Sequence, residues 1–152
     1  MICLIQRVKK CEVLVEKKII SQIKKGMLIF VGIEKNDSNL DIEYIVKKTL
    51  NLRIFSDENN NMNLSVKDIN GEILVVSQFT LCADIKHGRR PSFIKAEKPN
   101  QANVIYEKIL KRLKDTNLNI KSGIFGENMN VNISNDGPVT FIINSKEKKN
   151  EN

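Results

Sequence analysis

The chain has 152 residues, of which 41% are hydrophobic and 28% are charged, the ordinary balance of one soluble globular domain. Its formal charge of +7 favours a polyanionic partner, with nucleic acid first and an acidic membrane surface second. No apolar run approaches the roughly 20 residues of a membrane helix. The opening MICLIQRVKK lacks the basic leader and small-residue cleavage site of a signal peptide, so we expect no membrane partner.

The first half of the chain is rich in strand patterns. Three segments alternate between apolar and polar residues, and a fourth is a continuous apolar run that suits a strand covered on both faces. The four predicted strands are 1–8, 11–16, 19–23 and 27–33. Helical spacing then predicts a helix over 38–52, which begins with Ser38 and Asp41 as a possible capping box.

The second half alternates strands with one further helix. A short strand is predicted at 53–55 and a strong apolar one at 72–79, before a loop rich in Gly and Arg. A helix follows Pro99 with one apolar face. The last predicted strands lie near 119–125, 129–134 and 139–143. This pattern predicts an α+β domain over 1–144, mostly an antiparallel sheet or barrel with two packed helices, and a charged, disordered tail over 145–152.

The cysteines and the single histidine suggest no conventional catalytic device. Cys3, Cys11 and Cys82 are odd in number and lack CxxC spacing, which favours a reducing, cytoplasmic location over a disulfide framework or a zinc site. His87 stands alone in the polar loop DIKHGRRP, so we expect neither a metal site nor a Ser-His-Asp triad. A phosphate-binding GxxxxGK[ST] motif is also missing from the sequence.

Two short motifs concentrate polar and unusual backbone groups. SQFTL (77–81) ends the strongest strand with hydroxyls, an amide and free N–H groups, although Ser77 and Thr80 could simply satisfy neighbouring backbone. NDGPVT (135–140) places Gly137-Pro138 between two strand patterns, and a plain turn is the simplest interpretation.

Five motifs in this order resemble the D-aminoacyl-tRNA deacylases of the bacterial and eukaryotic type. They are IQRV (5–8), SQFTL (77–81), GRRPSF (88–93), FGENM (125–129) and NDGPVT (135–140), and the resemblance extends to about Ile143. It implies a deacylase-like fold and a cytoplasmic homodimer with active sites at the interface. The implied reaction is hydrolysis of the ester between a D-amino acid, or glycine, and the 3′-terminal adenosine of tRNA, a proofreading of chirality that requires no cofactor and no metal.

The resemblance also implies roles for individual residues. Gln78, Phe79 and Thr80 would be catalytic, with the N–H groups near Phe79 and Thr80 facing the scissile carbonyl. Gly137 and Pro138, joined by a cis peptide bond, would enter the partner's pocket. The remaining substrate-binding positions would be Ser77 at the pocket, Arg7 holding the Gly-Pro segment, and Phe125, Gly126 and Met129 against the terminal adenine.

Phosphate contacts are expected from Lys86, Arg89 and Arg90 in the loop. The helix lysines Lys108, Lys111 and Lys114 are further candidates, although ordinary solvated lysines are the simpler explanation for them. Two positions depart from the family pattern: His87 replaces a common lysine, and Glu127 replaces a small residue. Both departures affect only the expected details of RNA contact.

This chemistry suits an activated ester. Main-chain carbonyls of Gly137 and Pro138 would bind the substrate ammonium and exclude an L side chain by collision, whereas backbone N–H groups would stabilise the oxyanion and the tRNA 2′-hydroxyl would assist water. Thr80 as a covalent nucleophile is the competing mechanism. Two other functions stay open at this point: an L-aminoacyl-tRNA editing deacylase of the same fold with a trans Gly-Pro bond, and a non-catalytic RNA-binding β module.

Overall fold

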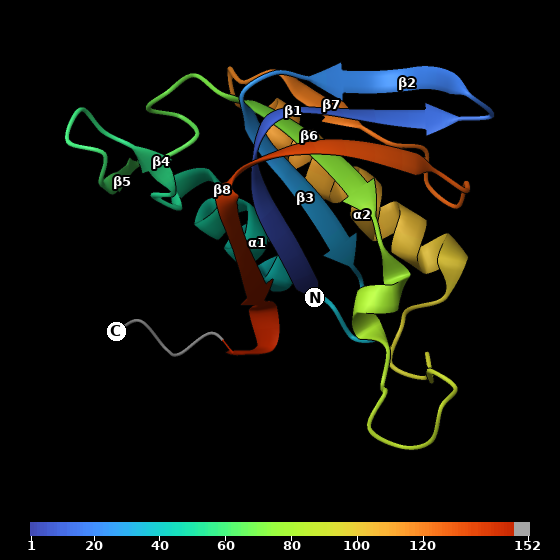
Figure 1. Cartoon of the computed structure of the whole chain (residues 1–152). Helices are drawn as coiled ribbons and strands as arrows, with labels where there is room; N and C mark the ends of the chain where they lie inside the picture. Colours follow the sequence, from blue (N-terminus) through green and yellow to red (C-terminus); the bar gives the residue numbers. More distant parts are fainter. Residues whose placement is uncertain (148–152) are drawn as a thin grey trace.

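The computed structural model describes residues 1–147, and it contains two α-helices and eight strands within that range (Figure 1). The strands are β1 (Ile2–Val15), β2 (Lys18–Ile23), β3 (Gly26–Gly32), β4 (Phe55–Ser56), β5 (Met62–Leu64), β6 (Glu72–Ser77), β7 (Ile120–Ser122) and β8 (Asn130–Asn144). The helices are α1 (Asn39–Asn51) and α2 (Pro99–Lys114), with short 3-10 turns η1 (Phe79–Cys82) and η2 (Ser145–Glu147). No helix of residues 1–147 is both long and apolar enough to cross a membrane.

The main sheet has the order β2-β1-β3-β6-β7, and β8 pairs with the other edge of β1. β1 is antiparallel to β2, β3 and β8, whereas the β3–β6 and β6–β7 pairs are parallel. The first half of β1 pairs with β3 and its second half with β2, so the strand bends across the sheet (Figure 1). The Ser21 hydroxyl on β2 donates to the Ser122 carbonyl on β7 at 2.8 Å. The sheet is therefore nearly closed, and the predicted α+β barrel with two packed helices is confirmed.

Two apolar clusters hold these layers together. The larger one lies between the sheet and the two helices, where Tyr106 and Ile109 of α2 and Ile45 of α1 are almost fully buried. The Tyr106 hydroxyl donates to the Val75 carbonyl at 2.8 Å, which fixes α2 against β6. The smaller cluster, which includes Leu74 of β6, fills the curled sheet. Because β6 contacts both clusters, its end is held firmly from two sides.

The structure corrects the predicted strand boundaries at two places. The predicted strands 1–8 and 11–16 are one strand, β1, and the predicted strands 129–134 and 139–143 are one strand, β8. The pairing of β1 with β8 shifts register between Gln6 and Val8 and again between Val8 and Lys10. These irregularities accommodate extra residues without ending the strands. The interpretation of NDGPVT as a plain turn is therefore wrong, because the motif lies inside β8.

The first three residues of the predicted tail also differ from expectation. Ser145–Glu147 form η2, and Ser145 is fully buried. Its N–H donates to the Met1 carbonyl at 2.9 Å, and its hydroxyl accepts from the Met1 ammonium at 3.0 Å. Lys146 pairs with the Asp37 carboxylate at 3.0 Å. Order thus continues past the expected boundary at 144, and residues 148–152 of the predicted tail lie outside the described residues.

Candidate active site

The SQFTL motif forms the end of β6 and the turn that follows it. The strand ends at Ser77, and η1 begins at Phe79. The Gln78 N–H donates to the Val31 carbonyl of β3 at 2.8 Å, which ties the junction to the sheet. The first N–H groups of a helical turn have no partner inside that turn. Accordingly, within residues 1–147 no backbone carbonyl accepts a hydrogen bond from the Phe79 or Thr80 N–H.

The side chains at this junction present polar groups on the surface. The Gln78 side-chain amide donates to Thr80 Oγ1, and Thr80 itself is exposed. Across the described part of the chain, no carboxylate or imidazole accepts a hydrogen bond from the Thr80 hydroxyl. Two exposed N–H donors and a fixed amide–hydroxyl pair therefore lie at one strand end, a set that suits binding of a developing oxyanion.

Cys82 lies behind this surface and plays a structural part. It is 2% exposed, and its thiol donates to the Ile33 carbonyl with a sulfur–oxygen distance of 3.5 Å. Burial raises the pKa of the Cys82 thiol to about 11, and the nearby Glu34 carboxylate adds to this shift. A protonated, buried thiol is a poor nucleophile at neutral pH.

Phe93 is a site neighbour that the sequence reasoning did not single out. Its ring lies 4.9 Å from that of Phe79, centroid to centroid, and both rings are substantially exposed. Asp84 and Ser92 pair just before Phe93, with N–H to carbonyl distances of 2.8 and 2.9 Å in the two directions. This pairing closes the intervening loop at its base. Phe93 is the last residue of the GRRPSF motif, but the spacing of residues in the sequence does not predict its contact with Phe79.

The predicted phosphate contacts lie on that closed loop. Lys86, Arg89 and Arg90 are all exposed, as is His87 between them. Gly88 has φ +73°, a conformation that favours glycine and reverses the chain at the tip. Within 1–147 none of the four basic side chains forms an ion pair, so the positive charges of the lysine and the arginines face solvent without a carboxylate partner.

Arg7 binds the chain immediately before Gly137-Pro138. Its Nε donates to the Asp136 carbonyl at 3.1 Å and lies 3.2 Å from the Asp136 carboxylate. Its Nη1 donates to the Ile54 carbonyl at 2.6 Å, and only 11% of the Arg7 side chain is exposed. Arg7 was expected beside this segment, whereas its partner Asp136 was not singled out. The guanidinium thus connects β1, β8 and the chain after α1 at one point.

Gly137 and Pro138 are exposed, and the bond between them is cis. Gly137 has φ +130°, which L side chains rarely adopt. A Cβ placed there would lie 2.7 Å from Val139 Cγ2 and 3.4 Å from Arg7 Nη2. This position therefore accommodates only glycine. Because glycine has no side chain, the Gly137 carbonyl is not shielded by one.

The FGENM segment lies between β7 and β8. The Phe125 ring lies 5.6 Å from the Tyr106 ring, and Gly126 adopts φ +81° at an exposed position. Met129 packs against the small core of the curled sheet. A cavity of about 320 Å³ beside it is lined by Leu14, Glu16, Lys17, Asn128, Met129 and Asn130. A shallow, partly apolar surface of this kind is compatible with a flat ring.

One chain does not bring all of these segments together. Arg7 and Gly137 adjoin each other, and Phe79 adjoins the basic loop through Phe93. No hydrogen bond or ion pair between described residues joins 77–81 to 135–140. Residues 1–147 contain no cluster of three or more His, Cys, Asp or Glu side chains that could hold a metal ion.

Comparison with known proteins assigns the chain to a family. Residues 4–144 match the family described as D-Tyr-tRNA(Tyr) deacylase. A D-aminoacyl-tRNA deacylase of Thermodesulfovibrio yellowstonii is 51% identical over 146 residues, covering 96% of this chain and 100% of the relative. One from Aquifex aeolicus is 53% identical over 143 residues, covering 94% and 97%.

Solved structures share the fold. The c-Myc DNA Unwinding Element Binding Protein has a TM-score of 0.91 at 40% identity, over 95% of this chain and 98% of that one. A probable eukaryotic D-amino acid tRNA deacylase has a TM-score of 0.80 at 16% identity, covering 93% and 97%, which shows a common fold only.

The fold and these relatives first define the class: the protein is an enzyme, a hydrolase that acts on ester bonds. More narrowly, the chain belongs to the D-aminoacyl-tRNA deacylase family. The expected family, the expected fold and the expected hydrolase class are thereby confirmed. The alternative of a non-catalytic RNA-binding module is wrong.

Proposed function

We propose that this deacylase releases D-amino acids, and glycine, from the 3′-terminal adenosine of tRNA while its backbone rejects L-aminoacyl esters. D-aminoacyl-tRNA deacylation follows from the family, whereas the chirality filter, glycyl-tRNA and the catalytic steps are our proposal. The observation that carries it is the pair of unpartnered N–H groups at Phe79 and Thr80. They lie at the end of β6, the strand whose side chains pack into both apolar clusters.

The proposed catalytic step uses backbone donors and the substrate's own hydroxyl. An N–H aimed at a developing oxyanion contributes roughly 3–4 kcal/mol in well-studied hydrolases. An aminoacyl ester is already activated, so a water oriented by the ribose 2′-hydroxyl suffices as nucleophile. Among the described residues no carboxylate or imidazole accepts a hydrogen bond from the Thr80 hydroxyl, which supports this route over covalent catalysis. The amide of Gln78 would then position Thr80 rather than activate it.

The proposed chirality filter consists of the Gly137 and Pro138 carbonyls, donated by a second copy of the chain. Arg7 fixes the preceding residue by two interactions with Asp136, so the carbonyls are held rather than free to rotate. Two main-chain acceptors would bind the substrate ammonium. With the ammonium and the ester both held, an L side chain would collide with the backbone and a D side chain would not. Glycine has no side chain to exclude, which is why we include glycyl-tRNA.

A homodimer with shared active sites is part of the same proposal. Within residues 1–147 no hydrogen bond or ion pair joins the Gly-Pro segment to the SQFTL residues of the same chain. The proposed site would therefore combine SQFTL of one copy with the Gly-Pro segment of the other. β8 is an edge strand, and it exposes Ile133, Phe141 and Ile142 at 36%, 37% and 69%. An exposed edge with large apolar side chains is a surface that a second copy would cover.

The remaining proposed contacts concern the nucleic acid. Phe125, Gly126 and Met129 would contact the terminal adenine beside the cavity of about 320 Å³. The unpaired cations Lys86, Arg89 and Arg90 would contact phosphates, so tRNA affinity should fall steeply as salt rises.

The test is hydrolysis of matched D- and L-tyrosyl-tRNA by the wild-type protein and by Gly137→Ala. We expect the wild type to prefer the D ester strongly and the variant to lose much of that preference. A Cβ at φ +130° meets Val139 and Arg7 and must displace the carbonyl. The control is Thr140→Ala in the same strand, where the exposed hydroxyl accepts a hydrogen bond from the Gln6 side-chain amide at 3.3 Å. Equal rates of the wild type on both esters would refute the filter.

A further inference from the structure

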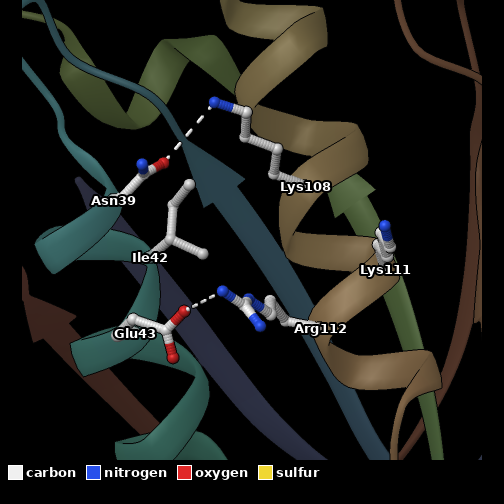
Figure 2. Close-up of a pocket in the computed structure, with 6 residues that line it drawn as sticks. All are labelled: Asn39, Ile42, Glu43, Lys108, Lys111 and Arg112. Carbon is white, nitrogen blue, oxygen red and sulfur yellow. Dashed lines mark hydrogen bonds and ion pairs between the residues drawn. The ribbon is translucent and has the colours of Figure 1, made fainter.

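A second basic surface lies apart from the proposed active site, in the groove between α1 and α2. The groove has a volume of about 280 Å³. It is lined by Asn39, Ile42 and Glu43 of α1 and by Lys108, Lys111 and Arg112 of α2 (Figure 2). Three cations and one carboxylate therefore face a single hollow, a net positive lining. The proposed active site does not include this groove, although the sequence marked Lys108 and Lys111 as candidates for phosphate contacts.

The charges in the groove are unequally compensated. Arg112 is paired with Glu43 at 2.9 Å, which neutralises the one carboxylate of the lining. Lys108 reaches across to Asn39, but the amide oxygen at 3.5 Å is a neutral acceptor, so the ammonium charge is not cancelled (Figure 2). Lys111 forms no ion pair with any described carboxylate, including Glu107 one turn before it. Two uncompensated ammonium groups thus stand one helical turn apart at the edge of the hollow.

The chain leads from the basic loop of the active site to this groove through the segment before α2 and the first turns of α2. The loop of Arg90 leads into the segment before α2, where the Lys35 N–H donates to the Lys95 carbonyl at 2.9 Å. Lys98 then precedes the first residue of α2. From Lys98 to Lys108 the helix rises about 15 Å, at about 1.5 Å per residue. No cation lies on α2 between Lys98 and Lys108, so the groove is a second positive region, separated from Lys98 by a distance that several nucleotides would span.

We propose that the α1–α2 groove binds backbone phosphates of the substrate tRNA, beyond its 3′ end, through Lys108 and Lys111. This inference rests on the proposed tRNA substrate and adds a binding site to it. Charge complementarity selects the occupant: the uncompensated ammonium groups of Lys108 and Lys111 match backbone phosphates, and tRNA is the polyanion that the proposed reaction already requires the protein to bind. Such contacts would add affinity without reading sequence, as suits an enzyme that must accept many tRNAs.

The test compares two substrates with the double variant Lys108→Gln/Lys111→Gln. One substrate is full-length D-tyrosyl-tRNA and the other is the 3′-O-D-tyrosyl ester of adenosine, which cannot reach the groove. We expect KM for tRNA to rise while kcat/KM for the adenosine ester stays unchanged. Each lost phosphate contact reduces the salt slope of tRNA binding by about 1. The loss of affinity between about 50 and about 200 mM salt should then be roughly tenfold smaller than for the wild type.

The matched control is Lys47→Gln/Lys48→Gln, which removes the same charge from exposed positions of α1 outside the groove. An unchanged melting temperature for both doubles confirms that folding is intact. A salt slope equal to that of the wild type, or a change no larger than in the control, would overturn the inference. A wild-type protein that hydrolyses neither ester would instead refute the proposed function. In that case the salt dependence of direct tRNA binding by the two double variants would still show whether the groove binds phosphates.

Discussion

Replacing Arg7 by methionine tests the strongest anchor of the proposed site. The change keeps an unbranched apolar side chain as far as the position of Nε and removes three interactions: one with the Ile54 carbonyl at 2.6 Å and two with Asp136 at 3.1 and 3.2 Å. Ile54 is 1% exposed, so water cannot readily replace the lost donor at its carbonyl. Asp136, at 30% side-chain exposure, can be rehydrated.

The magnitude follows from that difference in access to water. A hydrogen bond from a charged donor contributes about 1.5–3 kcal/mol, and a buried carbonyl left unpaired costs about 1–3 kcal/mol. Water can partly replace the interactions that Asp136 loses. We therefore expect the free energy of unfolding to fall by about 2–4 kcal/mol in total. For a domain of this size, that corresponds to a melting temperature lower by roughly 5–15 °C.

Urea unfolding at fixed protein concentration measures the stability, and steady-state deacylation of D-tyrosyl-tRNA at 25 °C measures kcat/KM. If the variant is still folded at 25 °C, a large loss of kcat/KM reports displacement of the Gly137 and Pro138 carbonyls and not unfolding. The matched control is Arg53→Met, which removes an exposed arginine whose Nε donates to the Asn63 carbonyl at 2.7 Å, and which should cost about 1 kcal/mol or less. A destabilisation no larger than this control would refute the energetic reasoning, and full activity of folded Arg7→Met would refute the positioning role.

Two further predictions concern Thr80 and Asp41. Thr80→Ala should retain most of the kcat on D-tyrosyl-tRNA, because backbone N–H groups remain; a near-complete loss in a folded variant would favour a covalent Thr80 nucleophile. Burial raises the pKa of Asp41, but hydrogen bonds from Ser38 and the charge of Lys146 outweigh it and hold that pKa well below its usual value. This stabilisation is complete above the unfolded pKa of about 3.9 and is lost progressively as pH falls towards the folded value. Asp41→Asn should therefore destabilise the protein most at about pH 7 and progressively less below about pH 4; an equal effect at about pH 7 and about pH 2 would contradict this.

The helices were well predicted because their signals are local. Ser38 and Asp41 do form a capping box at the start of α1, and the apolar face predicted after Pro99 is the buried face of α2. Both signals act over one or two turns, so neighbouring residues in the sequence are also neighbours in space. The strand pattern likewise predicted an apolar β6, which is buried between the two clusters.

The sequence by itself determined both helices, most of the strands, the excess of positive charge and, through five short motifs, the family. Only the tertiary structure decided that β1 and β8 are each continuous, because a strand that bends at an irregular pairing has the same local pattern as two strands with a turn. It also decided which atoms meet: Arg7 and Asp136 are 129 residues apart, and Phe79 meets Phe93 across a closed loop. Contacts of this kind arise from long-range pairing of strands, which leaves no periodicity to read in the sequence.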